Sequence, residues 1–456
     1  MKTTSLSFLF ILFLVILIPS SLSITDELVY FEMGKNIITI GKPCLIKNNN
    51  IIYPRFQGFY PLLLTPYILC AKYLGKIFYF VFNEQTSNML NWALIPLFNG
   101  IITLVIFYLI RLFINSSYNM SFIFVTSCIL LFYSKTLFIE PVLSLFMFLS
   151  VMFLYKQRYL LSSMFIAFLV ILKPVNIIYT PVFYIFFLLK NRNLLKNIEF
   201  LAISILLPVI LHFAYNSFYR GDFYNFGYQP RYYDTLTKVW VHQGFSHSIL
   251  RGLAGYLFSP GKSFFIYNPL LLLALAGIIK GIIEKQILAV MIFILFLQTI
   301  FLYAGWAPWE GGLCYGPRFL LIIVPILSAG FIYLKDITYK KIFKILFVGL
   351  SSIGFIINFT ASITNVYNAY LKSGRYGTGH SFSMTYNYLY DIFKELVYTI
   401  ADPSISPNLI LKLFPDAGLF LLLLFTGFLI FSIVLFDWNR SVRGDYTAPS
   451  AGRQGI

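Results

Sequence analysis

The sequence predicts an all-α polytopic membrane protein with about twelve transmembrane helices, joined by outer loops that carry interfacial helices. Three observations lead to this fold class. Hydrophobic residues make up 59% of the 456 residues and charged residues only 11%, apolar runs of spanning length recur along the chain, and basic residues fall in the gaps between them. Soluble domains carry about a quarter charged residues. Water is therefore not the main solvent of this chain, and we expect residues 1–440 to form one transmembrane domain.

The apolar runs are taken in chain order. We expect spans near residues 6–22, 89–114, 120–136, 138–155, 159–172, 175–189, 197–215, 264–283, 286–304, 319–334, 341–359 and 416–436. Several are shorter than the roughly 20 residues of a straight span, so their ends are defined only to within a few residues. The stretches 24–88, 216–263 and 360–415 are rich in Tyr, Asn, Gly and Pro, and we expect partly ordered outer loops with interfacial helices there.

The two ends of the chain need separate interpretation. The first run has a lysine, an apolar core and a small-residue ending, as a cleavable signal peptide does. We favour an uncleaved first span, because further spans follow as a signal anchor requires. Residues 441–456 differ in composition from all that precedes them and predict a disordered cytoplasmic tail or a remnant of vector-encoded sequence.

Lysine and arginine set the orientation. The predicted spans place these basic residues on one side: Lys156, Arg158, Lys190, Arg192, Lys196, Lys280, Lys285, Lys335, Lys340, Lys341, Lys344, Arg440 and Arg443. By the positive-inside rule that side is the cytoplasm, so both termini are cytoplasmic and the acidic clusters lie outside. The net charge of +17 is thereby assigned to inner loops, and we expect no nucleic-acid partner.

The parity of the spans depends on residues 59–82. A span here would invert every later helix, but Pro66, Lys72 and Lys76 favour a segment that lies along the interface or re-enters it. The four cysteines are far apart and form no C-x-x-C pattern, which indicates neither a zinc site nor a disulfide framework.

Two acidic positions stand out on the outer side. T-D-E-L-V-Y, residues 25–30, places Asp26 and Glu27 directly after the first span. Three interpretations fit these acids: solvated loop residues, a helix N-cap formed by Asp26, or functional carboxylates. Glu140 lies between two apolar runs, where ionisation toward lipid is costly. We expect it to face the bundle interior or a wet cavity, with an ion pair to Lys135 as the alternative.

Cations occur on the same side. Lys173, in L-K-P-V-N, sits where the chain must turn outside, and it either binds phosphate as a point charge or snorkels to the headgroups. The turn W-A-P-W-E-G-G-L-C-Y-G-P-R-F, residues 306–319, joins Trp306, Trp309, Glu310 and Arg318. The tryptophans suit stacking on sugar or prenyl surfaces and Arg318 suits a bidentate grip on phosphate, whereas the alternative is an interfacial aromatic belt.

The loop 216–263 is less informative. Its polar residues are Arg220, Asp222, Arg231, Asp234, His242 and His247. The H-x-x-x-x-H spacing is no recognised metal pair and no third ligand is evident. The loop is acceptor-facing or simply surface, with no preference between the two.

On these motifs the chain resembles the GT-C superfamily of membrane glycosyltransferases, which includes protein O-mannosyltransferases and lipid A aminoarabinose transferases. The resemblance rests on Asp26 and Glu27 in T-D-E-L-V-Y, Glu140 in I-E-P, Y-P-L-L-L-T-P-Y, and W-E-G-G-L-C-Y-G-P-R-F-L-L, and it covers roughly residues 1 to 350. It implies a large catalytic cavity facing away from the cytoplasm, in the plasma (inner) membrane. The W-W-D type of signature of oligosaccharyltransferases does not occur, which argues against transfer of a preassembled glycan.

The resemblance implies a polyprenyl- or dolichyl-monophosphate sugar as donor, transferred with inversion to a hydroxyl group of a glycan, lipid or protein acceptor. Asp26 matches the catalytic base. Glu27 or Glu140 then orients the acceptor or raises the basicity of Asp26, while Lys173 and Arg318 neutralise the leaving phosphate. We expect Tyr30, Trp306, Trp309 and Glu310 to contact substrate. No cofactor is required, and a divalent cation at the acids stays open.

Two other classes fit parts of the pattern. A transporter or flippase of a lipid-linked glycan also needs many spans and a cationic cavity, but it predicts charges near mid-bilayer in broken helices. A glycan polymerase or ligase would need paired outer arginines in large loops, and Arg220 with Arg231 leaves that open.

Overall fold

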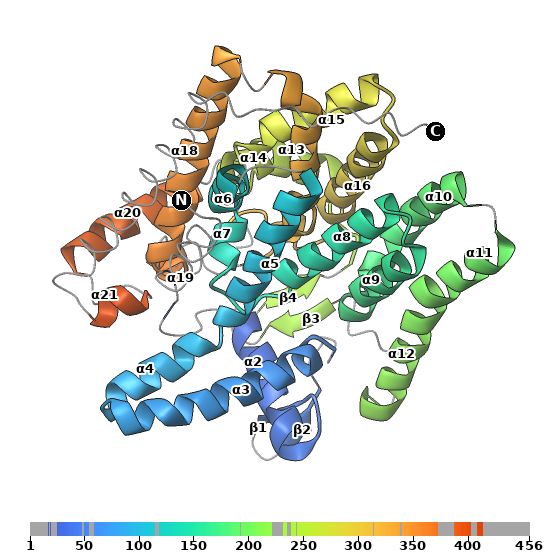
Figure 1. Cartoon of the computed structure of the whole chain (residues 1–456). Coiled ribbons are helices and arrows are strands. Elements are labelled where there is room, and N and C mark those ends of the chain that lie inside the picture. Colours follow the sequence, from blue (N-terminus) through green and yellow to red (C-terminus); the bar gives the residue numbers. More distant parts are fainter. Residues whose placement is uncertain are drawn as a thin grey trace.

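Helices make up most of the regular structure in the computed structural model, and two short antiparallel hairpins interrupt them (Figure 1). The structure describes residues 17, 19, 25–47, 50–53, 59–114, 118–191, 193–220, 231–234, 239–242, 244–312, 314–337, 340–372, 387–402 and 408–413. The predicted span 416–436, the tail 441–456 and all of the predicted span 6–22 except Leu17 and Pro19 lie outside these residues.

The first half of the chain contains these elements: α2 (Thr25–Ile40), β1 (Leu45–Lys47), β2 (Asn50–Ile52), α3 (Phe59–Val81), α4 (Glu84–Leu94), α5 (Leu97–Ile114), α6 (Tyr118–Thr126), α7 (Leu130–Tyr133), α8 (Glu140–Tyr155), α9 (Tyr159–Leu172), the 3₁₀ helix η1 (Pro174–Tyr179) and α10 (Thr180–Lys190). One continuous helical rod follows, made of α11 (Leu194–Leu201), the π-helix η2 (Ala202–Leu206), α12 (Leu207–Tyr215) and the π-helix η3 (Asn216–Arg220).

The second half contains β3 (Arg231–Asp234), β4 (Val239–His242), α13 (Ile249–Phe258), α14 (Phe264–Tyr267), α15 (Leu271–Ile283), α16 (Ile287–Ala304), the 3₁₀ helix η4 (Arg318–Ile323), α17 (Val324–Leu327), the 3₁₀ helix η5 (Ser328–Ile337), α18 (Lys341–Ile363), α19 (Val366–Lys372), α20 (Tyr388–Ala401) and α21 (Leu409–Leu413). Strand β1 pairs with β2 with Leu45 opposite Ile52, and β3 pairs with β4 with Arg231 opposite His242.

Several helices begin at residues whose side chains cap the first turn. The Asn83 side chain accepts a hydrogen bond from the Thr86 amide at α4, and Asn193 accepts from the Leu195 and Lys196 amides at α11. These amides have no partner inside their own helix, so a side-chain oxygen before the first turn stabilises the helix start.

Most of the predicted spans correspond to apolar helices. Five helical segments are long and apolar enough to cross a membrane, at Leu97–Ile114, Leu194–Tyr219, Ile287–Ala304, Arg318–Asp336 and Lys341–Ile363. Shorter apolar helices occupy Glu140–Tyr155, Tyr159–Leu172, Pro174–Lys190 and Leu271–Ile283, where further spans are predicted.

Two of the predicted spans were wrong in their details. The run 89–114 is divided near Pro96, which has no amide hydrogen to continue the helix of α4, and the run 120–136 breaks between α6 and α7.

The segment 59–82 forms one helix, α3, that contains Pro66. It packs against α2 and pairs with α4 as a hairpin (Figure 1), and the Tyr67 hydroxyl donates a hydrogen bond of 2.7 Å to the Leu94 carbonyl. It is not among the five helices that can cross a membrane by length and composition. Its interfacial placement stays a prediction.

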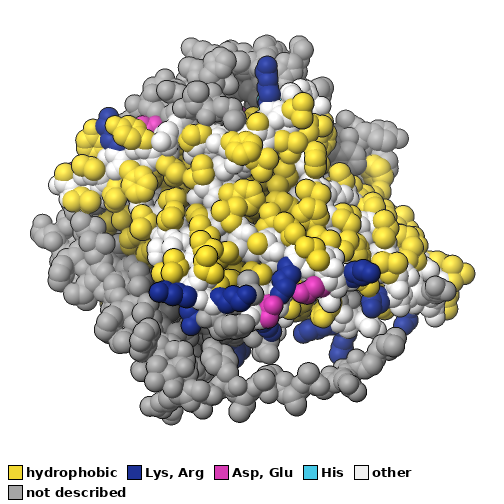
Figure 2. Space-filling model, turned by 90° about the horizontal axis from the view of Figure 1, so that it is seen from above, with side chains coloured by type: hydrophobic (Ala, Val, Ile, Leu, Met, Phe, Trp, Pro, Cys, Tyr) yellow, Lys and Arg dark blue, Asp and Glu magenta, His cyan; other side chains and the backbone are white. Residues whose placement is uncertain are grey.

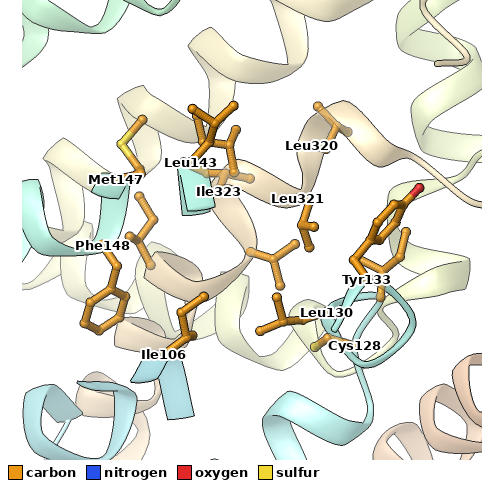
Figure 3. Packing of buried hydrophobic residues seen from close by; sticks show 14 of the residues in the cluster. Ile106, Cys128, Leu130, Tyr133, Leu143, Met147, Phe148, Leu320, Leu321 and Ile323 are labelled. Atoms are coloured by element: carbon orange, nitrogen blue, oxygen red, sulfur yellow. The ribbon is translucent and has the colours of Figure 1, made fainter. Parts of the chain in front are cut away.

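Helix α8 lies in the centre of the bundle. Figure 3 shows Leu143, Met147 and Phe148 of α8 within one apolar cluster that also contains residues of η4 and α5. The Ser144 hydroxyl donates a 2.8 Å hydrogen bond to the Leu321 carbonyl and ties the start of α8 to η4. Nearby, α15 and η5 approach closely because both have glycine at the contact; a Cβ added to Gly277 would lie 2.1 Å from the Gly330 carbonyl oxygen.

The bundle has two chemically different ends. Lys280 near the end of α15 pairs with Asp336 at 2.5 Å and with Glu284 at 3.6 Å. Helix α8 likewise begins at Glu140 and is followed by Lys156 at its other end. Figure 2 shows an apolar face with a row of Lys and Arg side chains along one edge. A lipid-facing surface with basic residues at one end is the arrangement expected of a membrane-spanning bundle.

Candidate active site

Three charged side chains from distant parts of the sequence meet at the end of the bundle opposite Lys280. The Nη1 atom of Arg318 lies 3.0 Å from Oδ2 of Asp26, and its Nε atom lies 3.5 Å from Oε1 of Glu140. The Arg318 side chain is only 10% exposed and that of Glu140 4%. Charges this buried are stable only when paired, so the arginine and the two acids hold one another in place.

Local structure explains how the acids reach this point. Helix α2 begins at Thr25, so Asp26 and Glu27 both lie in its first turn. Glu140 is the first residue of α8 and is followed by Pro141, a residue suited to the first turn of a helix. Carboxylates at helix N-termini are stabilised by the helix dipole. The N-cap reading of Asp26 was wrong, because Asp26 is already inside the helix.

The backbone just before Glu140 is anchored from three helices. Oε1 of Glu27 accepts a 2.6 Å hydrogen bond from the Leu137 amide, and Nδ2 of Asn99 donates a 2.7 Å bond to the Phe138 carbonyl. The Tyr60 hydroxyl donates to the same carbonyl at 3.0 Å. The buried Glu27 thus contacts backbone through this oxygen. Sequence reasoning named Tyr60 only as the first residue of the Y-P-L-L-L-T-P-Y motif and did not single out Asn99, since a polar residue in an apolar run gives no sign of its partner.

Lys135 does not form the ion pair with Glu140 that the sequence offered as an alternative. Its ammonium donates to the Ser362 carbonyl and lies 5.1 Å from the centre of the Phe132 ring. The ion-pair partner of Glu140 among the described residues is Arg318. The planar guanidinium reaches two carboxylates at once, which a single ammonium does less well.

Lys173 lies near this group and shares the Phe319 ring with Arg318. Its ammonium nitrogen is 4.5 Å from the centre of the Phe319 ring and 4.8 Å from that of Tyr303, and these two rings stack at 4.8 Å. The guanidinium carbon of Arg318 is 4.9 Å from the same Phe319 ring. Two cations therefore lie close to one aromatic ring, an arrangement that concentrates positive charge next to the acids.

Tyr30 also borders the charged group. It is buried, and its ring meets that of Tyr60 edge to face at 4.9 Å. Burial, followed by the nearby charges of Asp26 and Glu140, raises the pKa of the Tyr30 hydroxyl well above its ordinary value. Tyr30 is accordingly a neutral phenol at physiological pH, able to donate or accept a hydrogen bond at the edge of the site.

The turn between α16 and η4 begins with Trp306 and Trp309, which pack against aromatic neighbours. Trp309 packs against α13, where its ring meets that of Tyr256 edge to face at 5.4 Å and stacks near His247 at 6.0 Å. Trp306 meets Phe245 at 5.1 Å. Both tryptophans are partly buried. Their predicted contact with sugar stays a prediction.

Glu310 belongs to the same turn and lies close to Lys262, which comes from the turn between α13 and α14. Glu310 is half-buried, and this burial raises the pKa of its carboxyl despite the nearby Lys262. Lys262, fully buried between α13 and α14, donates hydrogen bonds to the Cys314 carbonyl at 2.5 Å and the Gly312 carbonyl at 3.4 Å. Sequence reasoning missed Lys262, because S-P-G-K-S looks like any short polar loop among many lysines.

The described polar side chain that the sequence analysis named in the loop 216–263, His247, lies beside Trp309. The His247 amide donates to the Gly305 carbonyl at 3.2 Å, which fastens this loop to the end of α16. Of Arg220, Arg231, Asp234 and His242 only the backbone is described, and Asp222 lies outside the described residues. That this loop either faces the acceptor or is simply surface stays a prediction.

Two buried polar atoms of the charged group have no hydrogen-bond partner among the described residues. They are Oε2 of Glu140 and Nε of Arg318. Such atoms are rare in folded proteins and often mark a place where a ligand or water binds. The described residues contain no group of three or more His, Cys, Asp or Glu side chains able to hold a metal ion. The question of a divalent ion stays open.

Comparison with known proteins supports the fold. No protein-family model matches the chain, and no curated protein matches it. It is similar in structure to ArnT from Cupriavidus metallidurans, solved in the apo state and bound to undecaprenyl phosphate. Both comparisons give a TM-score of 0.50 and 11% identity over 87% of this chain, and cover 76% and 77% of the ArnT chain. The chain therefore shares the overall fold of ArnT, in agreement with the predicted all-α polytopic membrane fold.

Proposed function

We propose that this protein is an inverting glycosyltransferase that moves a sugar from a polyprenyl or dolichyl monophosphate donor to a hydroxyl acceptor. The observation that carries the proposal is the convergence of Asp26 and Glu140 on Arg318. A carboxylate next to an arginine supplies the two things this reaction needs, a base for the acceptor and a cation for the leaving phosphate. The likeness to ArnT bound to undecaprenyl phosphate points to the same class of donor.

In the proposed reaction, Asp26 takes the proton of the acceptor hydroxyl while its oxygen attacks the anomeric carbon. The bond from that carbon to the phosphate oxygen breaks, and the lipid phosphate leaves with an additional negative charge. Arg318 has five N–H donors, so its contacts with Asp26 and Glu140 leave others for the phosphate. Lys173, which lies over the same Phe319 ring as Arg318, adds a second positive charge. No cofactor takes part in these steps.

Glu27 and Glu140 take different parts in this scheme. Glu140 ion-pairs with Arg318 and keeps one carboxylate oxygen for the acceptor or for Tyr30 beside it. Glu27 holds the backbone that leads to Glu140, so we assign it a positioning part. Trp306, Trp309 and Glu310 contact the sugar or the prenyl chain in this proposal, from the turn that precedes Arg318.

We place the reaction on the outer side of the plasma (inner) membrane, with both termini in the cytoplasm. The basic residues of the chain favour this orientation, because Lys156 and Lys280 lie at the ends of α8 and α15 away from Arg318. Basic loops remain on the cytoplasmic side of a membrane. The acceptor is a hydroxyl of a glycan, a lipid or a protein that reaches this outer side.

The test is a transfer assay with the full chain in lipid nanodiscs. Polyprenyl-phosphate sugars with a labelled sugar are incubated with cell-envelope extracts that contain glycans, lipids and proteins, and Asp26→Asn is compared with the wild type. We expect transfer to be lost. Glu32→Gln is the matched control, because Glu32 lies on the same helix in an exposed ion pair with Lys35. Retained turnover in Asp26→Asn would refute the proposed base, and movement of intact lipid-linked glycan without transfer would favour the transporter alternative.

A further inference from the structure

Lys262 is a fully buried cation to which the proposed reaction gives no part. It lies in the tight turn between α13 and α14, where the Lys262 amide donates to the Ser259 carbonyl at 3.2 Å. The Ser263 hydroxyl donates to the Leu257 carbonyl at 2.8 Å. These bonds hold the turn, so the Lys262 side chain leaves it in one direction, toward the carbonyls of Gly312 and Cys314.

Those carbonyls belong to the turn that leads into Arg318. Gly311, Gly312 and Gly316 have φ values of +77°, +71° and +55°, a left-handed conformation that other residues seldom adopt. Backbone in this conformation turns its carbonyls away from regular partners, and a buried carbonyl needs a donor. The ammonium of Lys262 donates to the Cys314 carbonyl and, at a longer distance, to the Gly312 carbonyl, which also accepts from the Cys314 amide at 2.7 Å.

The same turn touches the Arg318 side chain. A Cβ placed on Gly311 would lie 3.5 Å from Cβ and 3.6 Å from Nε of Arg318, which means that the Gly311 backbone is packed along this side chain. The Nε atom is also the one that faces Glu140. A shift of the turn would therefore change where the guanidinium lies.

Charge adds a second link. Lys262 is close enough to Glu310 and Arg318 for their charges to act on it, and it also lies near the Cys314 thiol. Burial lowers the pKa of Lys262 to about 7. The charged form of Lys262 prevails below that pH, where it adds positive potential behind Arg318; the neutral form prevails above it.

We propose that Lys262 is a positioning residue for phosphate binding: it holds the turn Glu310–Arg318 so that Arg318 meets the lipid phosphate, and its charge strengthens that binding. The inference rests on the proposed function, because it presumes that a lipid phosphate binds at Arg318. It assigns Lys262 no contact with the substrate itself. A purely structural lysine would hold the turn equally well at every pH and leave phosphate affinity unchanged by its own titration.

The experiment measures binding of undecaprenyl methyl phosphate to the full chain in nanodiscs between about pH 6 and pH 9. This probe is a phosphodiester, so its own charge stays constant over that range. We expect wild-type affinity to fall as the pH rises through about 7, because Lys262 loses its proton there. Lys262→Met removes the charge and should weaken binding about tenfold at the acidic end, with no further fall at higher pH. Lys280→Met, at the opposite end of the bundle, should behave as wild type.

Lys262→Arg and Glu310→Gln show which of these two residues causes the pH dependence of binding. An arginine keeps its charge throughout, so Lys262→Arg should bind the probe without the pH-dependent fall, even where its larger side chain lowers the affinity overall. In Glu310→Gln the affinity for the probe should still fall as the pH rises. This result would assign the pH dependence to Lys262. If Lys262→Met binds like wild type at the acidic end of the range, the inference is overturned. It is likewise overturned if Lys262→Arg retains the wild-type pH dependence, and this second result can be obtained even where Lys262→Met fails to fold.

Failure of the proposed function would be seen separately, as absence of probe binding by the wild type. In that case, hydrogen exchange of the backbone amides from Glu310 to Arg318 tests whether Lys262 holds this turn. Faster exchange in Lys262→Met than in Lys280→Met supports it, and equal exchange in both overturns it. Exchange reports local opening of the backbone and needs no substrate.

Discussion

Arg318 Nη1 lies 3.0 Å from Asp26 Oδ2, although 292 residues separate the two in the chain. The pair joins the first turn of α2 to the first residue of η4, and both elements have an end at the same place in the bundle. Because Glu140 contacts the same guanidinium, removing Arg318 leaves both acids without this partner, whereas removing either acid leaves the buried arginine with one carboxylate. The first predictions concern this group.

Replacing Arg318 with lysine keeps the positive charge but not the geometry. A single ammonium is not expected to meet Asp26 and Glu140 and still present donors to a phosphate, whereas the guanidinium has several donors in one plane. We expect transfer to fall by a factor of about 100 or more, the size seen when one donor that stabilises a transition state is lost. Initial rates with a saturating donor measure the effect. A rate within twofold of wild type would contradict the proposed part of Arg318.

Lys173→Met should affect donor binding more than the chemical step. The lysine lies over Phe319 and Tyr303 and adds charge from a distance, so its loss removes attraction for the phosphate in every bound state. We expect the KM for the donor to rise several-fold while kcat changes little. Lys173→Arg should restore most of the affinity. An unchanged KM would show that Lys173 only reaches toward the lipid headgroups.

Glu27→Ala should destabilise the protein and displace Glu140. The substitution leaves the buried Leu137 amide without its acceptor, which costs about 1–3 kcal/mol. Glu27→Gln keeps an acceptor oxygen and should lose less. Thermal unfolding in detergent compares both with Glu32→Ala, which removes an exposed acid from the same helix. Equal melting temperatures for Glu27→Ala and Glu32→Ala would be inconsistent with the anchoring contact.

Gly277→Val tests the close contact between α15 and η5. A side chain at Gly277 would run into the Gly330 backbone, so the two segments must separate, at a cost of about 1–3 kcal/mol. Gly349→Val is the matched control, because a Cβ at Gly349 meets nothing within 4 Å. Melting temperature should drop for the first variant and stay near wild type for the second. A similar drop in both would show that valine is harmful for reasons other than packing.

Much of the site was predictable from the ends of the apolar runs. Asp26, Glu140, Lys173 and Arg318 each stand where a predicted span begins or ends on the outer side, and the structure brings Asp26, Glu140 and Arg318 into contact. Their pairing was not predictable. Sequence reasoning offered Lys135 to Glu140 because the two are close in the chain, but closeness in sequence does not determine which way a side chain points after a turn.

The amino-acid sequence by itself determined that this protein is a helical membrane bundle, and it predicted that acids and cations gather at the same end. It does so because hydropathy and basic loops act locally, along the chain. Only the tertiary structure decided that Arg318 joins Asp26 to Glu140, that Tyr60 and Asn99 anchor the backbone before Glu140, and that Lys262 supports the turn before Arg318. These contacts depend on how helices pack and rotate against one another, which the periodicity of a single chain does not specify.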